Sequence, residues 1–147
     1  MSATVQQPVA LARASVGEIV YRHERGPATL TQLAYYCAAV GVVDPIHYDR
    51  LFAREAGFPD AVVNGSLRIA WMSQVLADFA GSQGRLVHLS CNHRGLLLVG
   101  QAMVTELVLA EPIQPDADLA QIRLEVRCLA SGTVCDSGQA ICEMRMG

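Results

Sequence analysis

The chain has 147 residues, 52% of them apolar and 17% charged, with a formal net charge of −3 at pH 7. This length most simply forms one domain, residues 1–147, which is large enough to bury a core. All eleven basic residues are arginine, so the lack of lysine excludes Schiff-base catalysis and a Walker-type phosphate loop, and the lack of a basic cluster argues against nucleic-acid binding.

A strand and a helix are predicted first. Residues 17–24 have a β-favouring centre, typical of a strand. Thr29 and Gln32 have the spacing of a capping box, which predicts a helix that begins there and runs to Val40. Gly41 suits the C-terminal cap of that helix.

A loop and a short helix follow. Pro45 disfavours the α region for the residue before it, so Asp44 is expected to be extended. Asp49 can then cap a short helix over residues 50–56, which Gly57 ends.

The longest predicted helix covers residues 64–80. It contains no proline, Asn64 or Ser66 can cap its start, and Gly81 can end it. Apolar side chains spread around much of its circumference, which is typical of a helix buried on several sides. Trp71 is therefore expected in the core.

The period of the pattern then changes to that of β-structure. Four strands are predicted over residues 85–94, 100–110, 119–130 and 133–144, the last two joined by a hairpin at Ser131-Gly132. One strand, helices, and then a run of antiparallel strands indicate the α+β class. Periodicity leaves the arrangement of the sheet open within that class.

An ordered series of motifs resembles the signature of the MaoC-like, R-specific enoyl-CoA hydratases. The motifs are Asp44-Pro45-Ile46-His47-Tyr48-Asp49, Ala53, Gly57-Phe58, Val62-Val63-Asn64-Gly65 and Leu98-Val99-Gly100-Gln101. The resemblance implies a hot-dog fold, in which an antiparallel sheet wraps a long central helix. It also implies dimers formed through the sheets, acyl-CoA thioester substrates, and neither a cofactor nor a metal.

The chain departs from the family pattern at three positions. The family's catalytic aspartate falls on Val42, its asparagine on Asp44, and the histidine before the helix glycine on Asn64. His47 and Gly65 are the two elements of the family's chemistry that remain.

These two residues suit the reaction that the resemblance implies. Hydration of a 2-enoyl thioester needs a base for the water and an acid for the α-carbon, and histidine exchanges protons near neutral pH. A backbone N–H at a helix start can stabilise the enolate oxygen, and glycine allows the ligand to come close. The predicted substrate-binding residues are Gly65, Asn64 and Ser73. Ser73 lies two turns after Gly65 along the helix.

The second proton-transfer group is uncertain at this level. In an extended segment Val42 and Asp44 point the same way but lie about 6.5 Å apart, so a catalytic Asp44, acting with His47, requires a rearranged loop. A turn role explains Asp44 better than catalysis does, whereas the motif favours a site role for His47 over that of a loop residue bonded to Asp49 or a backbone carbonyl. Arg68 and Arg94 either contact CoA phosphates or are ordinary surface residues.

Three functions follow from this pattern. The leading hypothesis is one subunit of a heteromeric enoyl-CoA hydratase, in which a paralogous MaoC-like partner carries the complete Asp/His pair. The second is a self-sufficient hydratase or dehydratase that uses His47 with Asp44. The third is a hot-dog thioesterase or a non-catalytic acyl-CoA binding module, and the lack of a carboxylate in the first two turns of the long helix disfavours a thioesterase.

The composition also bears on compartment and assembly. No apolar run approaches the length that crosses a bilayer, so the apolar surplus is expected to cover an interface in a homodimer or heteromer. Residues 1–7 are polar and lack a signal-peptide pattern, which predicts a cytoplasmic protein. The five cysteines are an odd number without a CxxC pair, so neither a metal site nor a disulfide framework is expected.

Overall fold

The computed structural model describes residues 11, 13–114 and 118–146. The polar start at residues 1–7 therefore lies outside the described residues. Within the part of the chain that is described, no helix is long and apolar enough to cross a membrane.

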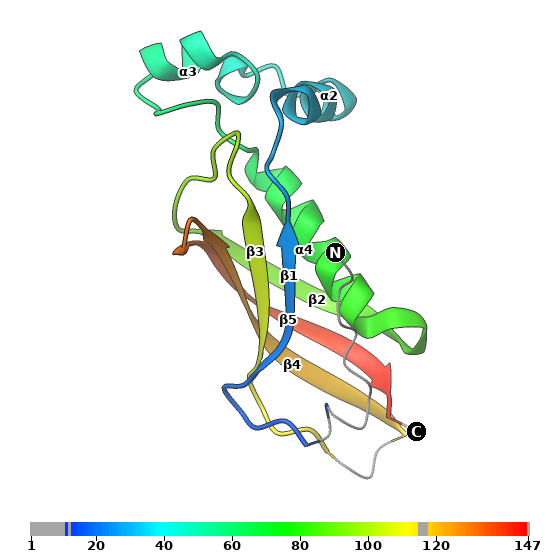
Figure 1. The fold of residues 1–147 in the computed structure, drawn as a ribbon. Helices are drawn as coiled ribbons and strands as arrows, with labels where there is room; N and C mark the ends of the chain where they lie inside the picture. The colour runs from blue at the N-terminus through cyan, green and yellow to red at the C-terminus, as the bar shows by residue number, and fades with distance from the viewer. Residues whose placement is uncertain (1–10, 12, 115–117, 147) are drawn as a thin grey trace.

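The chain folds into one antiparallel sheet, a long helix against it, and two shorter helices at one end (Figure 1). The elements in order are β1 (Ile19–Arg25), α2 (Leu30–Val40), the 3-10 turn η1 (Pro45–His47), α3 (Arg50–Glu55), α4 (Gly65–Ala80), the 3-10 turn η2 (Gly81–Gln83), β2 (Gly84–His93), β3 (Met103–Leu109), β4 (Leu119–Ala130) and β5 (Thr133–Arg145). The strands lie in the order β1-β3-β4-β5-β2, and every neighbouring pair is antiparallel. The expected α+β architecture is confirmed.

The core lies between α4 and the inner face of the sheet. Every second side chain of β4 is buried, which is the alternation of a strand with one face on the core. Trp71 on α4 is buried in the same cluster, as predicted. Buried apolar side chains each contribute about 1.5–3 kcal/mol to stability, so this interface holds α4 firmly on the sheet.

The predicted ends of the helices agree with the structure at several positions. Thr29 and Gln32 form the capping box, Asp49 caps α3 through the amides of Leu51 and Phe52, and Gly41 ends α2 with a φ of 71°. The hairpin between β4 and β5 turns at Ser131-Gly132, as predicted, with φ values of 50° and 80°. Local turn chemistry was therefore sufficient for these features.

One predicted strand boundary differs because tertiary hydrogen bonds compete with the sheet. The strand predicted from residue 100 begins only at Met103, since the Val99 amide donates to Ala61 and the Gly100 amide to Ala28. The turn η1 was not predicted. It forms because the Asp44 carboxylate accepts from the Ile46 amide, 3.2 Å away, at a proline-started turn.

Candidate functional site

Three segments meet at the start of α4. The segment before the helix runs beside the loop that follows β2: the Val63 amide donates to Leu97 at 2.8 Å, and Val62 forms an isolated bridge with Leu98. The Val62 amide also donates to Ile46 of η1 at 3.0 Å. Backbone hydrogen bonds thus fix η1, the helix start and the end of β2 relative to one another.

His47 is held by this assembly at its Nδ1 atom. Nδ1 lies 2.7 Å from the carbonyl oxygen of Val62, and the side chain is half-buried. A carbonyl oxygen can only accept, so Nδ1 carries the proton and Nε2 is left as a free acceptor. Gly65, the first residue of α4, follows three residues after Val62. The structure therefore brings both surviving family elements to the same segment.

An apolar pocket lies where the family pattern has a carboxylate. It has a volume of about 310 Å³ and is lined by Ala34, Cys37, Ala38, Val42, Val43 and Tyr48. None of these six side chains carries a carboxylate. Val42 therefore leaves His47 without the acidic partner that the family pattern places there.

The other predicted site residues make local bonds. Asp44 is exposed and caps η1, and the Ser73 hydroxyl donates back to the Ile69 carbonyl at 3.0 Å. Of the two predicted caps, Asn64 or Ser66, Asn64 is the N-cap residue of α4, but its side chain makes no capping bond. Its side chain is buried and accepts instead from Cys37 Sγ at 3.6 Å, because α2 packs against the helix start.

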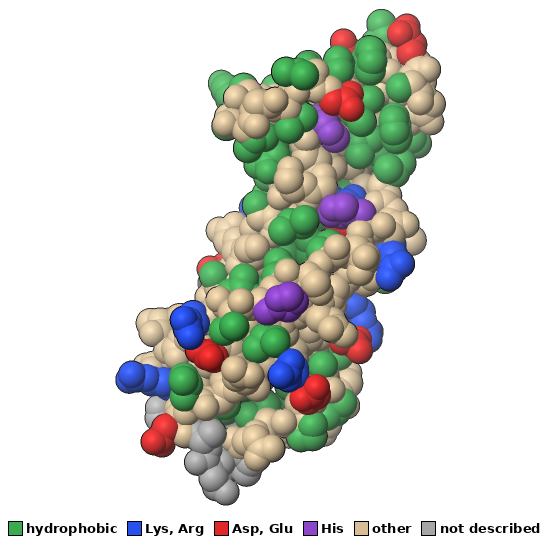
Figure 2. Space-filling view, turned by 180° about the vertical axis from the view of Figure 1, so that it is seen from behind, with side chains coloured by type: hydrophobic (Ala, Val, Ile, Leu, Met, Phe, Trp, Pro, Cys, Tyr) green, Lys and Arg blue, Asp and Glu red, His purple; other side chains and the backbone are tan. Residues whose placement is uncertain are grey.

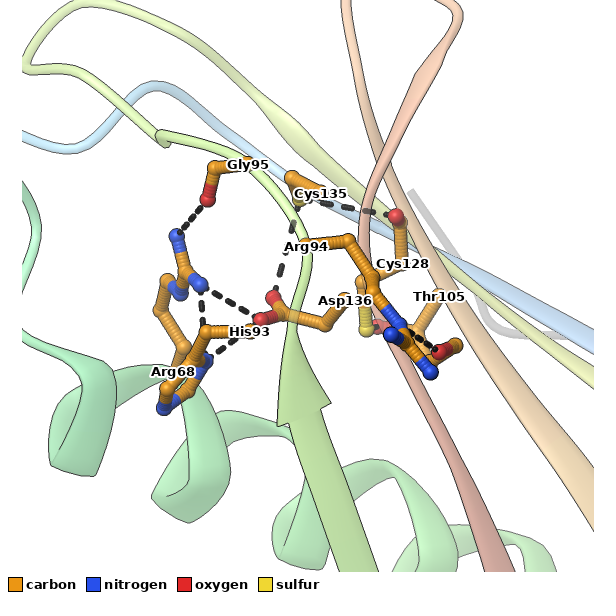
Figure 3. Close-up of polar contacts among 9 residues, drawn as sticks. Arg68, His93, Arg94, Gly95, Thr105, Cys128, Cys135 and Asp136 are labelled. Atoms are coloured by element: carbon orange, nitrogen blue, oxygen red, sulfur yellow. Dashed lines mark hydrogen bonds and ion pairs between the residues drawn. The ribbon is translucent and has the colours of Figure 1, made fainter.

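A second polar cluster lies beside the helix start (Figure 3). Arg68 of α4 and Asp136 of β5 form an ion pair at 2.5 Å, with side chains 3% and 0% exposed. His93, at the end of β2, places Nδ1 2.6 Å from the same Asp136 oxygen. Arg68 Nη1 also donates to the Gly95 carbonyl at 2.9 Å. One buried carboxylate thus ties together α4, β2 and β5.

The imidazole of His93 faces the first residue of α4. A Cβ atom placed on Gly65 would lie 2.5 Å from Nε2 of His93, closer than real Cβ contacts allow. The His93 side chain is 41% exposed, so the ring is in contact with solvent as well as with the helix start. Glycine at this position therefore leaves room for the histidine ring as well as for an approaching ligand.

The same cluster contains the ligand types of a metal site. Cys91, His93 and Asp136 offer three donor atoms that lie within 4.8 Å of one another. Burial, and secondarily the charge of Asp136, raise the pKa of the Cys91 thiol, which favours the protonated form. The Arg68 guanidinium already neutralises Asp136, and a metal cation would be repelled by it. The donor set fits an ion pair better than a metal centre.

Sequence reasoning missed this cluster. Arg68 was considered for CoA phosphates or the surface, but it is buried against Asp136 and faces neither. His93 and Asp136 are 43 residues apart, and no local pattern joins them. The available signal was an aspartate at a position of β5 that the alternation assigns to the core, since such a carboxylate needs a partner.

The molecular surface near the site is apolar. Figure 2 shows apolar side chains gathered over the end formed by α2 and α3. The exposed large apolar residues of this region are Tyr35, Val40, Val43, Leu51 and Phe52. A cavity of about 520 Å³ lies at the opposite end of α4, around η2 and Arg85.

Comparison with known proteins gives one family and one fold. Residues 12–127 match the family described as the MaoC like domain. The (R)-hydratase from A. caviae involved in PHA biosynthesis superimposes with a TM-score of 0.75 at 21% identity, over 90% of this chain and 98% of that one. The ChsH1–ChsH2 complex from Mycobacterium tuberculosis gives 0.73 at 15% identity, over 90% and 99%.

A further structural neighbour is the R-hydratase PhaJ1 from Pseudomonas aeruginosa. It superimposes with a TM-score of 0.73 at 20% identity, over 91% of this chain and 83% of that one. No curated protein sequence matches the chain. At such identities the structural likeness establishes the fold, and the hot-dog fold expected from the sequence is confirmed.

Proposed function

Because the chain belongs to the MaoC-like domain family, we propose that it is an enoyl-CoA hydratase-type protein that acts on acyl-CoA thioesters. The observation that carries the proposal is the fixed position of His47 beside the start of α4. Its Nδ1 is bound to the carbonyl oxygen of Val62, three residues before the helix begins, and its Nε2 remains free.

The proposed chemistry uses the helix start as an oxyanion site. The Gly65 amide donates to the thioester oxygen, where negative charge develops as water adds to C3. His47 contacts the water through its free Nε2 and orients it for attack, within a site whose proton-transfer groups each contribute about 10²–10⁴ in rate. The reverse reaction, dehydration of a 3-hydroxyacyl thioester, uses the same groups.

A second candidate function follows from Val42. With an apolar pocket in place of the family's carboxylate, the chain would serve as one subunit of a heteromeric hydratase whose paralogous MaoC-like partner carries the complete pair. The exposed apolar surface over α2 and α3 supports an assembly of two chains, homomeric or heteromeric. One structural neighbour is a complex of two differently named chains, ChsH1 and ChsH2.

Asp44 is the other residue considered for the missing group. Its bond to the Ile46 amide favours a structural role, and the loop would have to open before the carboxylate could act with His47. The proposal requires no cofactor and places the protein in the cytoplasm, where its cysteines remain reduced.

The test is hydration of 2-enoyl-CoA thioesters, from crotonyl-CoA to a steroid side-chain thioester, by the purified chain. Turnover that the His47→Ala variant abolishes supports a hydratase with its own site. Binding of the same thioesters without turnover supports the heteromeric candidate, and the paralogous chain should then restore turnover. Neither binding nor turnover, with a folded sample, would overturn the proposal.

A further inference from the structure

We propose that His93, positioned by Asp136, is a catalytic proton-transfer residue of this chain and replaces the carboxylate lost at Val42. The inference rests on the proposed hydratase function and names the second group of that site. His93 reaches the start of α4 from the end of β2, whereas Val42 lines the apolar pocket beside α2.

The first argument is the environment of the ring. Nδ1 of His93 lies 2.6 Å from Asp136 Oδ1 and 2.7 Å from Arg68 Nη2. A guanidinium can only donate, and the carboxylate is the strong acceptor between the two donors. In the tautomer that proton transfer requires, Arg68 and the Nδ1–H group of His93 both donate to Asp136, and Nε2 of His93 faces the helix start as an acceptor.

The second argument is the direction of that free nitrogen. Nε2 faces Gly65, whose amide opens α4 and is the proposed oxyanion donor. With 41% of its side chain exposed, His93 can be reached by water and substrate. His47 repeats this arrangement on the other side, since its Nδ1 is also bound to an oxygen and its Nε2 is free. Two imidazoles thus flank the segment that begins the helix.

The third argument is that Asp136 bonds His93 in addition to its ion pair with Arg68. Asp136 is fully buried, and its ion pair with Arg68 would already satisfy its charge. A half-exposed histidine bonded to such a carboxylate is held in one orientation and one tautomer, and the imidazolium formed on accepting a proton is stabilised. These are the properties of a base oriented for proton transfer.

The step balances without any other reactant. As the water oxygen bonds to C3 of the 2-enoyl thioester, one water proton passes to His93 Nε2, and the π electrons of the C2–C3 bond move to the thioester oxygen at Gly65. The enolate then takes that proton from His93 at C2, which restores the neutral imidazole. His47 Nε2 accepts a hydrogen bond from the O–H group that remains on the added oxygen.

The test compares His93→Gln, His93→Gly and Asp136→Asn with the wild-type chain on crotonyl-CoA. We expect His93→Gln to lower kcat by about 10²-fold or more with little change in KM, because proton transfer is lost while binding is kept. Added imidazole should restore turnover to His93→Gly, which a structural role would not allow. Asp136→Asn should lower kcat less, and the ¹⁵N spectrum of His93 should lose the fixed Nδ1–H tautomer.

His88→Gln is the matched control, since His88 is exposed on the same strand and faces a different pocket. Wild-type turnover in His93→Gln, with turnover lost in His47→Ala, would overturn the inference and leave the proposed function intact. A wild-type chain that binds acyl-CoA without turnover would also overturn it and support the heteromeric candidate. Loss of both binding and turnover would refute the hydratase function itself.

Discussion

His93 and Asp136 are direct partners across β2 and β5, and their side chains meet at 2.6 Å. Side chains of such a pair lie on the same face of the sheet, here the face against α4. The register of two strands therefore places a buried carboxylate behind a half-exposed imidazole at the helix start. A slip of one residue in this register would separate them, because it moves one of the side chains to the other face.

The contact between His93 and Gly65 predicts the effect of adding a single methyl group. In Gly65→Ala the new Cβ would meet Nε2 at 2.5 Å, so the ring must rotate away from Asp136. We expect kcat to fall at least about 10-fold, while the melting temperature changes little because alanine is a good helix former. Gly26→Ala is the control, since its Cβ would meet nothing within 4 Å. Equal activity in both variants would contradict the predicted contact.

The buried ion pair predicts an asymmetric effect on stability. Arg68→Met leaves Asp136 buried without its guanidinium, which should lower the free energy of unfolding by about 3–5 kcal/mol. Replacing both residues, in Arg68→Met with Asp136→Leu, should recover much of that loss because no charge remains buried. Urea unfolding of the four members of this cycle measures the coupling. Additive effects would show that the pair does not interact.

Asp44 should prove a structural residue. Its carboxylate caps η1, so Asp44→Ala should lower stability by about 0.5–2 kcal/mol, the usual effect of losing such a cap. Turnover should stay within a few-fold of the wild type at temperatures where the protein is folded. Asp49→Ala, which removes the cap of α3, is a matched control for stability. A collapse of kcat in Asp44→Ala alone would make Asp44 the missing proton-transfer group.

The buried thiols predict a loss of stability at alkaline pH. Burial raises the pKa of Cys128 to about 12 and that of Cys142 to about 11. Unfolded thiols ionise near pH 8.5, so above that pH the unfolded state releases protons that the folded state keeps. Each thiol should therefore lower the free energy of unfolding by about 1.4 kcal/mol per pH unit between its unfolded and its folded pKa. Urea unfolding from pH 8 to pH 10 measures the slope, and Cys128→Ala should reduce it.

Chelation should leave the protein unchanged. Arg68 forms an ion pair with Asp136, the carboxylate of the cluster with Cys91 and His93. We therefore expect dialysis against EDTA to alter neither kcat nor the melting temperature. Added zinc should not restore or raise activity. Loss of activity on chelation, with recovery on adding zinc, would instead make the three residues metal ligands. Cys91→Ser would then lower metal affinity.

Local signals were enough to predict most of the fold. The capping box at Thr29, the glycine at residue 41 and the turn at Ser131-Gly132 each follow from chemistry within a few residues. The predicted bounds of β4 also agree with the structure, in which every second side chain of that strand is buried. The start of β3 was placed too early because Gly100 bonds to Ala28, a partner that no local pattern reveals.

The sequence brought together only those candidate site residues that belong to neighbouring motifs. His47 and Gly65 belong to consecutive motifs, and the structure holds them in one hydrogen-bonded assembly. The second polar cluster depends on Arg68, His93 and Asp136, which lie on three different elements. Their association is decided by the strand order and by the placement of α4 on the sheet, which are long-range properties. The capping bond of the Asn64 side chain was wrongly predicted for the same reason, since that side chain accepts from Cys37 of α2 instead.

The position of β2 at the edge of the sheet has a consequence for biosynthesis. β2 pairs with β5 alone, yet about forty residues are translated between them. On the ribosome, α4 and β2 emerge before β5, so the edge of β2 stays unpaired until β5 has been translated. Such unpaired edges favour wrong association. The carboxylate that orients His93 emerges with that last strand. We therefore expect chaperones to protect the nascent chain until β5 pairs with β2. The proposed pair of His93 and Asp136 forms only at that point.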